Sequence, residues 1–126
     1  MHTIVKSATK TLTIGHDQPF CIIGERINPT GRKKFQEQLR AGDLSAINKD
    51  VSDQVAGGCN MLDVNMGVPL TDEPVLLSKA IKLIQTLTDL PICIDSSIIE
   101  ITNYKQYFPI HFFNRNIHSR NFFYTA

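Results

Sequence analysis

Three short apolar runs along the chain each end in polar residues. They are FCIIGERIN (20–28), CNMLDVNMG (59–67) and LPICIDSS (90–97). Near-continuous apolar runs of this length are typical of strands that are buried on both faces of a parallel sheet. The pattern therefore predicts three parallel strands, each followed directly by polar side chains.

The segment between the first two runs has the spacing of an amphipathic helix. Over residues 43–58 it forms one apolar stripe, which consists of Ile47, Val51 and Val55. Either Asp43 or Ser45 can cap the start of this helix, and the glycine pair at 57–58 can end it.

The segment between the second and third runs has the same character. Over residues 71–91 one helical face carries Leu76, Ala80, Leu83, Ile84 and Leu87. Thr71 can cap this helix, Asp72 and Glu73 favour the positive end of its dipole, and Pro74 is tolerated in a first turn. The element order is then β-α-β-α-β, the order of a parallel α/β sheet with right-handed crossovers.

The remaining segments are less regular. Residues 30–42 predict an extra short helix, whose Lys and Arg side chains we expect to form a solvated face. Residues 1–18 are interpreted as a lead-in segment, a hairpin that closes one end of the sheet. The main domain is assigned to residues 19–100.

The last segment, 101–126, differs in composition from the rest of the chain. It has no acidic residue, and it holds five of the seven Phe and all three Tyr. An aromatic, basic arm of this kind could stack on single-stranded nucleic acid. The interpretation that we favour is a frameshifted or truncated end, because this composition is typical of AT-rich DNA translated in a wrong frame.

Composition and charge exclude several classes of protein. The chain has 126 residues, of which 42% are hydrophobic and 20% charged, as expected for one modest globular domain. A net charge of +1 gives no electrostatic case for binding nucleic acid or an anionic membrane. No apolar run approaches a membrane span, and no signal peptide is recognisable, so we expect a cytoplasmic protein. The three cysteines are expected to be small buried hydrophobes.

Polar side chains follow each of the three predicted strands, and parallel strands bring their carboxyl ends to one edge. These residues are Glu25, Arg26, Asn28, Asp63, Asn65, Asp95, Ser96 and Ser97. They include no His, no nucleophile–base pair and no metal-ligand spacing. Carboxylates accept two N–H bonds side by side, and amides both donate and accept. That donor and acceptor set suits a flat, nitrogen-rich heterocycle such as a pterin.

Each of these residues also has a purely structural interpretation. Asp63 and Asn65 could cap a loop or the next helix, and Asp95 could be a helix N-cap. The segment from Asn28 to Gly31 could be only a turn, since Pro and Gly need no ligand to explain them there. Repetition at three consecutive strand ends favours the binding site.

Three segments, IGERINPTGRKKF, GGCNMLDVNMGVPLTDEP and LPICIDSSIIE, resemble the methyltetrahydrofolate:corrinoid methyltransferases, which include the folate-binding module of cobalamin-dependent methionine synthase. Dihydropteroate synthases are more distant relatives. The resemblance covers about residues 1–100 and implies a TIM (β/α)8 barrel. It implies that Asp95 hydrogen-bonds the pterin ring, and that Asn28, Asp63 and Asn65 line the mouth. No single catalytic residue and no metal ligand is implied.

The resemblance also implies substrates and partners. The methyl group on N5 of methyltetrahydrofolate would pass to the cobalt of a corrinoid that a partner protein or domain carries. A homodimer is implied if the barrel is complete. A complete barrel needs about 250 residues and eight strands. We therefore expect only the N-terminal part of a barrel, about three βα units, and an inactive fragment.

Two other functions stay open. One is a dihydropteroate synthase-like enzyme, although GERINPTG lacks the Asp-Ser-Phe signature of those enzymes. The other is a small non-catalytic α/β binding module that uses its aromatic end, with Phe112, Phe113, Phe122 and Phe123, to complete its core.

Overall fold

Seven segments of this computed structural model form the main sheet and the helices that cover it, and the structure describes residues 2–98 together with the backbone of 111–113. The sheet has the order β3-β4-β5-β6, and every neighbouring pair is parallel. Its strands are β3 (Ile23–Ile27), β4 (Met61–Val64), β5 (Ile92–Asp95) and β6 (His111–Phe113). The helices are α1 (Lys33–Arg40), α2 (Ser45–Ala56) and α3 (Glu73–Leu87).

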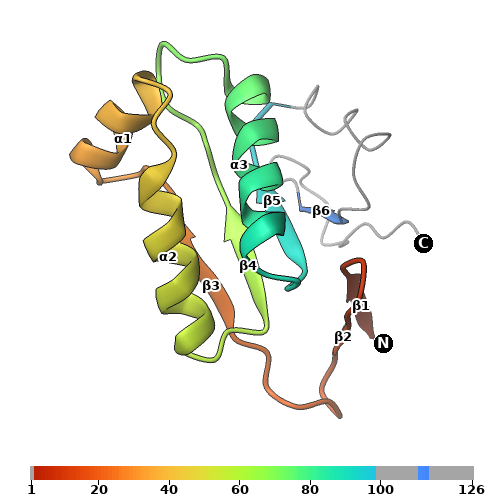
Figure 1. Ribbon diagram of the computed structural model, residues 1–126. Helices are drawn as coiled ribbons and strands as arrows, with labels where there is room; N and C mark the ends of the chain where they lie inside the picture. Colours follow the sequence, from red (N-terminus) through yellow and green to blue (C-terminus); the bar gives the residue numbers. More distant parts are fainter. Residues whose placement is uncertain (1, 99–110, 114–126) are drawn as a thin grey trace.

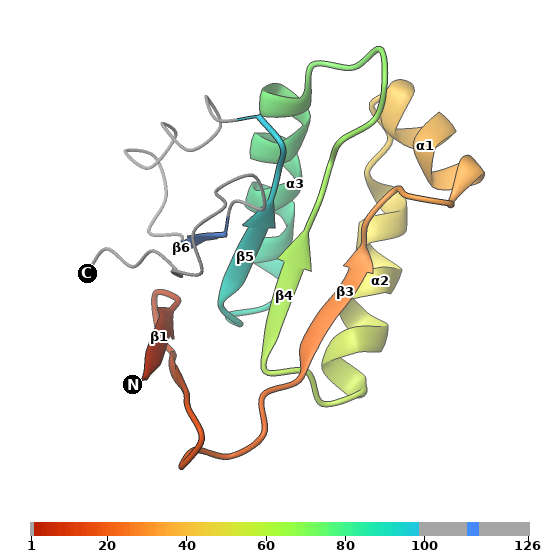
Figure 2. The ribbon, with the colours of Figure 1, turned by 180° about the vertical axis from the view of Figure 1, so that it is seen from behind.

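All three helices lie on the same face of this sheet, as the two opposite views show (Figures 1 and 2). The core fills the space between helices and strands, and its fully buried members include Ile27, Leu39, Ile47, Leu62, Val64, Met66, Ala80 and Ile84. The expected α/β fold with parallel strands is confirmed. It has the arrangement of part of a TIM barrel, and the described strands do not close into a ring.

The three predicted strands are present, and the sheet contains a fourth. β6 pairs with β5 in the register Cys93↔His111 and Asp95↔Phe113. It lies within the segment 101–126, and the rest of that segment is outside the described residues. So are the side chains of Phe112, Phe113, Phe122 and Phe123, on whose packing the binding-module hypothesis depends.

One expectation about the strands was wrong. β3 is not buried on both faces, because it is the edge strand of the sheet and has helices on one side only. Ile22 and Ile23 are 45% and 50% exposed, and Phe20, just before the strand, is 89% exposed. The apolar run at 20–23 therefore forms an exposed edge rather than a core strand.

The C-terminal end of α2 is as predicted, but neither Asp43 nor Ser45 is its N-cap residue. Asp43 Oδ1 accepts the backbone N–H of Ser45, at an N···O distance of 2.9 Å, while Leu44 occupies the N-cap position. Gly57 is the C-cap residue, and Gly58 adopts φ +83°. The N–H of Cys59 then returns to the carbonyl of Gln54. This left-handed ending explains the glycine at 58, where a Cβ atom would be strained.

The start of α3 differs from the prediction. Asp72, not Thr71, is the N-cap residue, and its carboxylate accepts the backbone N–H of Val75 at 3.2 Å. Thr71 instead donates its hydroxyl to the carbonyl of Val68 and so ends the preceding loop. Pro74 lies in the first turn, as expected, where its missing N–H removes no hydrogen bond. Aspartate outranks threonine slightly as an N-cap, which agrees with the one-residue shift.

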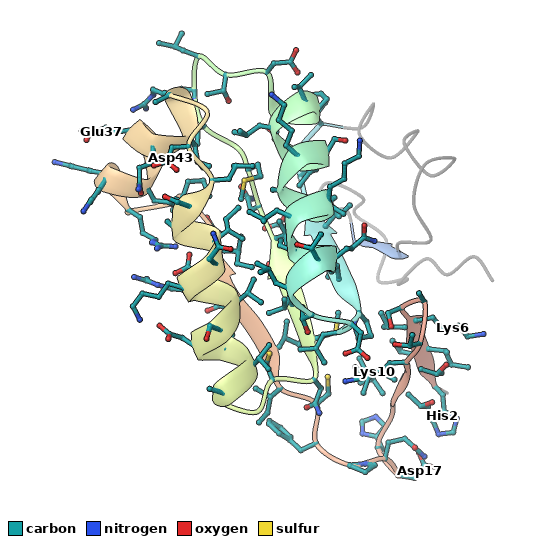
Figure 3. The ribbon with its side chains drawn as sticks, in the orientation of Figure 1. His2, Lys6, Lys10, Asp17, Glu37 and Asp43 are labelled. Atoms are coloured by element: carbon teal, nitrogen blue, oxygen red, sulfur yellow. The ribbon has the colours of Figure 1, made fainter. Side chains whose placement is uncertain are left out.

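The lead-in segment is an antiparallel hairpin, as predicted. Its strands β1 (Thr3–Lys6) and β2 (Thr11–Ile14) pair from Thr3↔Ile14 to Lys6↔Thr11. The hairpin contacts the turn before β5, where Lys10 Nζ lies 2.9 Å from a carboxylate oxygen of Asp89. Figure 3 shows the Lys10 side chain on the side of the hairpin that faces the helices and the sheet. The hairpin thus lies at the N-terminal end of the sheet.

The extra helix at 30–42 is confirmed as α1. Its residues Lys33, Lys34 and Arg40 are exposed, as a solvated face requires. None of the helices in the described part of the chain combines the length and the apolar character needed to cross a membrane.

Candidate functional site

The C-terminal ends of β4 and β5 bring two of the predicted site residues together. Asn65 Nδ2 donates to Asp95 Oδ2 at 3.3 Å, although the two residues are 30 positions apart in the chain. Asn65 Oδ1 accepts the backbone N–H of Gly67 at 2.8 Å, which fixes which way the amide is turned. Asp95 is only 5% exposed, whereas Asn65 is half-buried. The pair therefore places a partly desolvated carboxylate acceptor at this edge.

Asp63 lies within β4, two residues before Asn65, and its side chain is on the same face of the sheet. Leu62 and Val64 belong to the core under the helices, so the alternation of a strand turns Asp63 to the opposite face. In the sheet register Asp63 is level with Cys93, which directly precedes Ile94 and Asp95. Asp63, Asn65 and Asp95 therefore share the face that no described helix covers, near the C-terminal edge.

Asn28, the fourth predicted residue, lies just beyond the end of β3. Its Oδ1 accepts the backbone N–H of Thr30 at 2.9 Å, so this oxygen stabilises the turn at Pro29 and Thr30. The turn interpretation of this segment is thus correct for the oxygen. The described residues provide no hydrogen-bond partner for the amide nitrogen of Asn28, which can still donate to a ligand. Asn28 lies at the same edge, since the backbone N–H of Asn65 donates to the carbonyl of the preceding residue, Ile27, at 2.9 Å.

The charged residues before Asn28 have a different role. Glu25 and Arg26 are exposed, and β3 carries an irregularity in its pairing between Gly24 and Ile27. The backbone N–H of Arg26 donates to Gln54 Oε1 at 2.7 Å, and its carbonyl accepts from Arg32 at 2.7 Å. The side chains of Gln54 and Arg32 therefore satisfy the backbone N–H and carbonyl of Arg26 on this edge strand.

Sequence reasoning missed the buried ion pair behind that edge. Arg32 donates to both carboxylate oxygens of Asp50, at 2.7 and 3.1 Å, and its guanidinium lies 4.5 Å from the centre of the Phe35 ring. The expectation that the Lys and Arg side chains of this segment are solvated is therefore wrong for Arg32. The sequence signal was weak, since Asp50 lies among the polar positions of an amphipathic helix. The pair fastens the segment after β3 to α2.

A second buried contact was also missed. Ser96 donates its hydroxyl to Glu73 Oε1, with an O···O distance of 2.6 Å, and both residues are buried. The sequence suggested only a helix-dipole role for Glu73. The sequence did place Glu73 at the predicted start of a helix, close to the strand ends. That position was the available sign that Glu73 could contact Ser96.

The expectation of buried cysteines is correct for Cys59 only, because Cys21 and Cys93 are half-buried. All three are free thiols, and burial raises the pKa of both Cys21 and Cys59. A raised pKa keeps a thiol protonated and therefore poorly nucleophilic at neutral pH. Within residues 2–98, no three His, Cys, Asp or Glu side chains gather in a way that could hold a metal ion.

Two hollows in the described surface lie away from the strand ends. One of about 280 Å³ separates the hairpin turn at 7–9 from residues 88–90, and one of about 430 Å³ lies beside Arg26, Arg32 and the start of α1. Neither is lined by Asn28, Asp63, Asn65 or Asp95. These two hollows are therefore separate from the candidate site at the strand ends.

Comparison with known families gives one match. The family described as pterin binding enzyme matches residues 24–104, nearly two thirds of the chain. The matched range contains β3 except Ile23, together with β4, β5, all three helices and all four predicted site residues. The match agrees with the parallel strands and with the polar side chains at their C-terminal ends. The chain therefore belongs to the pterin-binding enzyme family.

Proposed function

We propose that this chain is the pterin-binding part of a methyltransferase that uses methyltetrahydrofolate. The observation that carries the proposal is the Asn65–Asp95 pair at the C-terminal ends of β4 and β5. The Asp95 carboxylate accepts from Asn65, and a carboxylate, with about four lone-pair positions, can accept several hydrogen bonds at once. The adjacent N–H groups of a pterin ring would donate to it side by side.

Other residues of the edge would orient the ring. Asp63, on the same face, would accept a further N–H, and the amide nitrogen of Asn28 would donate to a ring oxygen or nitrogen. These groups act by hydrogen bonding alone, so their contribution is to hold the pterin with N5 and its methyl group facing the open side. A buried carboxylate is well suited to this, because charge-assisted hydrogen bonds are stronger away from water.

The finer part of the proposal concerns the methyl acceptor. The motifs GERINPTG, LDVNMG and CIDSS resemble those of corrinoid methyltransferases, so we propose that the acceptor is a cobalamin-type corrinoid held by a partner protein or domain. The corrinoid would supply a cobalt centre that takes the methyl group. Methyl transfer would need a closed eight-stranded barrel, and the described sheet has four strands. A cytoplasmic location and a family-like homodimer belong to the same proposal. The 126-residue chain by itself would bind folate weakly and would not transfer the methyl group.

A dihydropteroate synthase-like activity is the alternative within the same family. It would use the same pterin contacts but would join the pterin to an aminobenzoate. The absence of Asp-Ser-Phe after Asn28-Pro29-Thr30 argues against it. The two activities differ in ligand, because one enzyme binds a methylated tetrahydrofolate and the other an unsubstituted dihydropterin.

Titration calorimetry on the full 126-residue chain tests the proposal, with 5-methyltetrahydrofolate and a dihydropterin as separate ligands. We expect the folate to bind, and Asp95→Asn to weaken binding by at least about tenfold, because the amide offers an N–H where a charge accepted one. Asp53→Asn, on the exposed face of α2, is the matched control and should bind like wild type. Preference for the dihydropterin would favour the synthase-like alternative. Absence of binding to either ligand would contradict both.

A further inference from the structure

Glu73 is a buried carboxylate at the first position of α3. It is 8% exposed, and the hydroxyl of Ser96, which is 6% exposed, donates to its Oε1 at 2.6 Å. Ser96 directly follows Asp95 at the end of β5. The contact therefore connects the start of a helix to the strand end that carries the candidate pterin acceptor.

Two further contacts extend this connection. Ser96 Oγ accepts the backbone N–H of Ile98 at 3.0 Å, which sets the course of the chain after β5. At Gly67, a Cβ atom would lie 3.2 Å from Asn65 Oδ1 and 3.5 Å from Glu73 Oε2. The Glu73 carboxylate therefore lies beside Ser96, which follows Asp95, and beside Gly67, whose N–H donates to Asn65.

Stability alone gives a poor reason for a carboxylate here. Among the described residues, no Lys, Arg or His forms an ion pair with Glu73. The helix dipole offsets part of the cost of a buried charge, about 0.3–1 kcal/mol for surface sites. An apolar side chain of similar volume would avoid the remaining desolvation cost. A buried polar group that folding does not favour is expected where a site must be built.

We propose that Glu73 is a positioning residue for the pterin site, which acts by holding the Ser96 hydroxyl and thereby the end of β5 that carries Asp95. The role rests on the proposed pterin function, but the connection itself exists without ligand. A positioning role predicts that a Glu73 variant keeps or gains folding stability and yet loses affinity for the pterin.

Two substitutions of similar size separate positioning from folding. Glu73→Gln keeps an acceptor oxygen for Ser96, and we expect it to bind 5-methyltetrahydrofolate within about threefold of wild type. Glu73→Met fills the same space without an acceptor. We expect its urea midpoint to be unchanged or higher, while its affinity falls about tenfold. Wild-type affinity in Glu73→Met would overturn the proposal, as would loss of affinity that only follows loss of stability.

A measurement on the unliganded chain keeps the two proposals distinguishable. Amide hydrogen exchange at Ile98 should be faster in Glu73→Met and unchanged in Glu73→Gln, because Ser96 is released only in the first. If Glu73→Met does not fold, Glu73→Leu also removes the acceptor for the Ser96 hydroxyl while leaving Ser96 in place, and it should expose the Ile98 amide equally. If wild type binds no pterin, the proposed function fails. The exchange result still shows whether Glu73 holds the Ser96 hydroxyl. Equal exchange in all variants would overturn this connection.

Discussion

Asn65 and Asp95 meet across the boundary between β4 and β5, and their side chains are joined by a hydrogen bond of 3.3 Å. The bond depends on the parallel register, in which Asp63 is level with Cys93 and Val64 with Ile94. Asp95 is the last residue of β5 and Asn65 directly follows β4, so the sheet holds the two backbones side by side. An edge built in this way presents its acceptors before any ligand arrives, which lowers the cost of binding.

Loss of the Asn65 amide should weaken pterin binding. Asn65→Ala removes the donor to Asp95 and the acceptor for the Gly67 N–H. We expect about a tenfold loss of affinity for 5-methyltetrahydrofolate and about 1 kcal/mol lower stability. Calorimetry and urea unfolding measure the two effects. Asn48→Ala, an exposed asparagine on α2, is the control, and an equal loss there would contradict a specific role for Asn65.

Removing one partner of the Arg32–Asp50 pair should destabilise the fold. The pair is bidentate, and the side chains of Arg32 and Asp50 are 20% and 9% exposed. Arg32→Met leaves a largely buried carboxylate without its cation, for which we expect a loss of about 3 kcal/mol in urea unfolding. Lys49→Met breaks an exposed pair with Asp53 and should cost less than about 0.5 kcal/mol. Similar costs for both variants would mean that burial does not strengthen the Arg32 pair.

Docking of the hairpin should depend on pH through Asp89. The hydrogen bond from Lys10, with a smaller contribution from Thr9, holds the pKa of the Asp89 carboxyl below its ordinary value. Since that ordinary value is about 3.9 in an unfolded chain, the contact stabilises docking above it and is lost as pH falls through the lower folded-state pKa. The protection of β1 amides, taken relative to the intrinsic exchange rate at each pH, should therefore fall only at pH values below about 4. Asp89→Asn should remove this dependence, and its persistence would assign the effect to another group.

The exposed edge at β3 should promote self-association. Ile23 is half exposed on an edge strand, next to the exposed Phe20 and Ile22. Unpaired edges with apolar side chains are templates for aggregation, and a charge on such an edge blocks it. Ile23→Lys should therefore reduce light scattering at high protein concentration. Leu70→Lys is the control, because Leu70 is 98% exposed but lies in a loop, and we expect little change from it.

Local sequence signals were sufficient for most of the elements. The three apolar runs marked β3, β4 and β5, although β3 continues through Glu25 and Arg26 to Ile27. The stripe with Ile47 and Val51 marked α2, and Gly58 marked its left-handed ending. These features depend on neighbours within a few residues, so the sequence carries them directly. The predicted N-cap at Thr71 was wrong by one residue, which is the usual precision for helix boundaries.

The burial of β3 could not be read from its composition. FCII looks like a core strand, and only its place at the edge of the sheet leaves Ile22 and Ile23 exposed. The same holds for Arg32, whose basic neighbours indicated a solvated face. Its pairing with Asp50 depends on how α2 packs beside the segment after β3, a contact between residues 18 positions apart.

The sequence by itself determined which polar residues follow the strands, and hence that Asn28, Asp63, Asn65 and Asp95 gather at one edge. It did so because parallel strands joined by helices must end on the same side. Only the tertiary structure decided which of these side chains touch. The register of β4 against β5 joined Asn65 to Asp95, the turn at Thr30 engaged the Asn28 oxygen, and the packing of α3 brought Glu73 to Ser96. These are contacts between distant segments, and their geometry is set by packing rather than by local pattern.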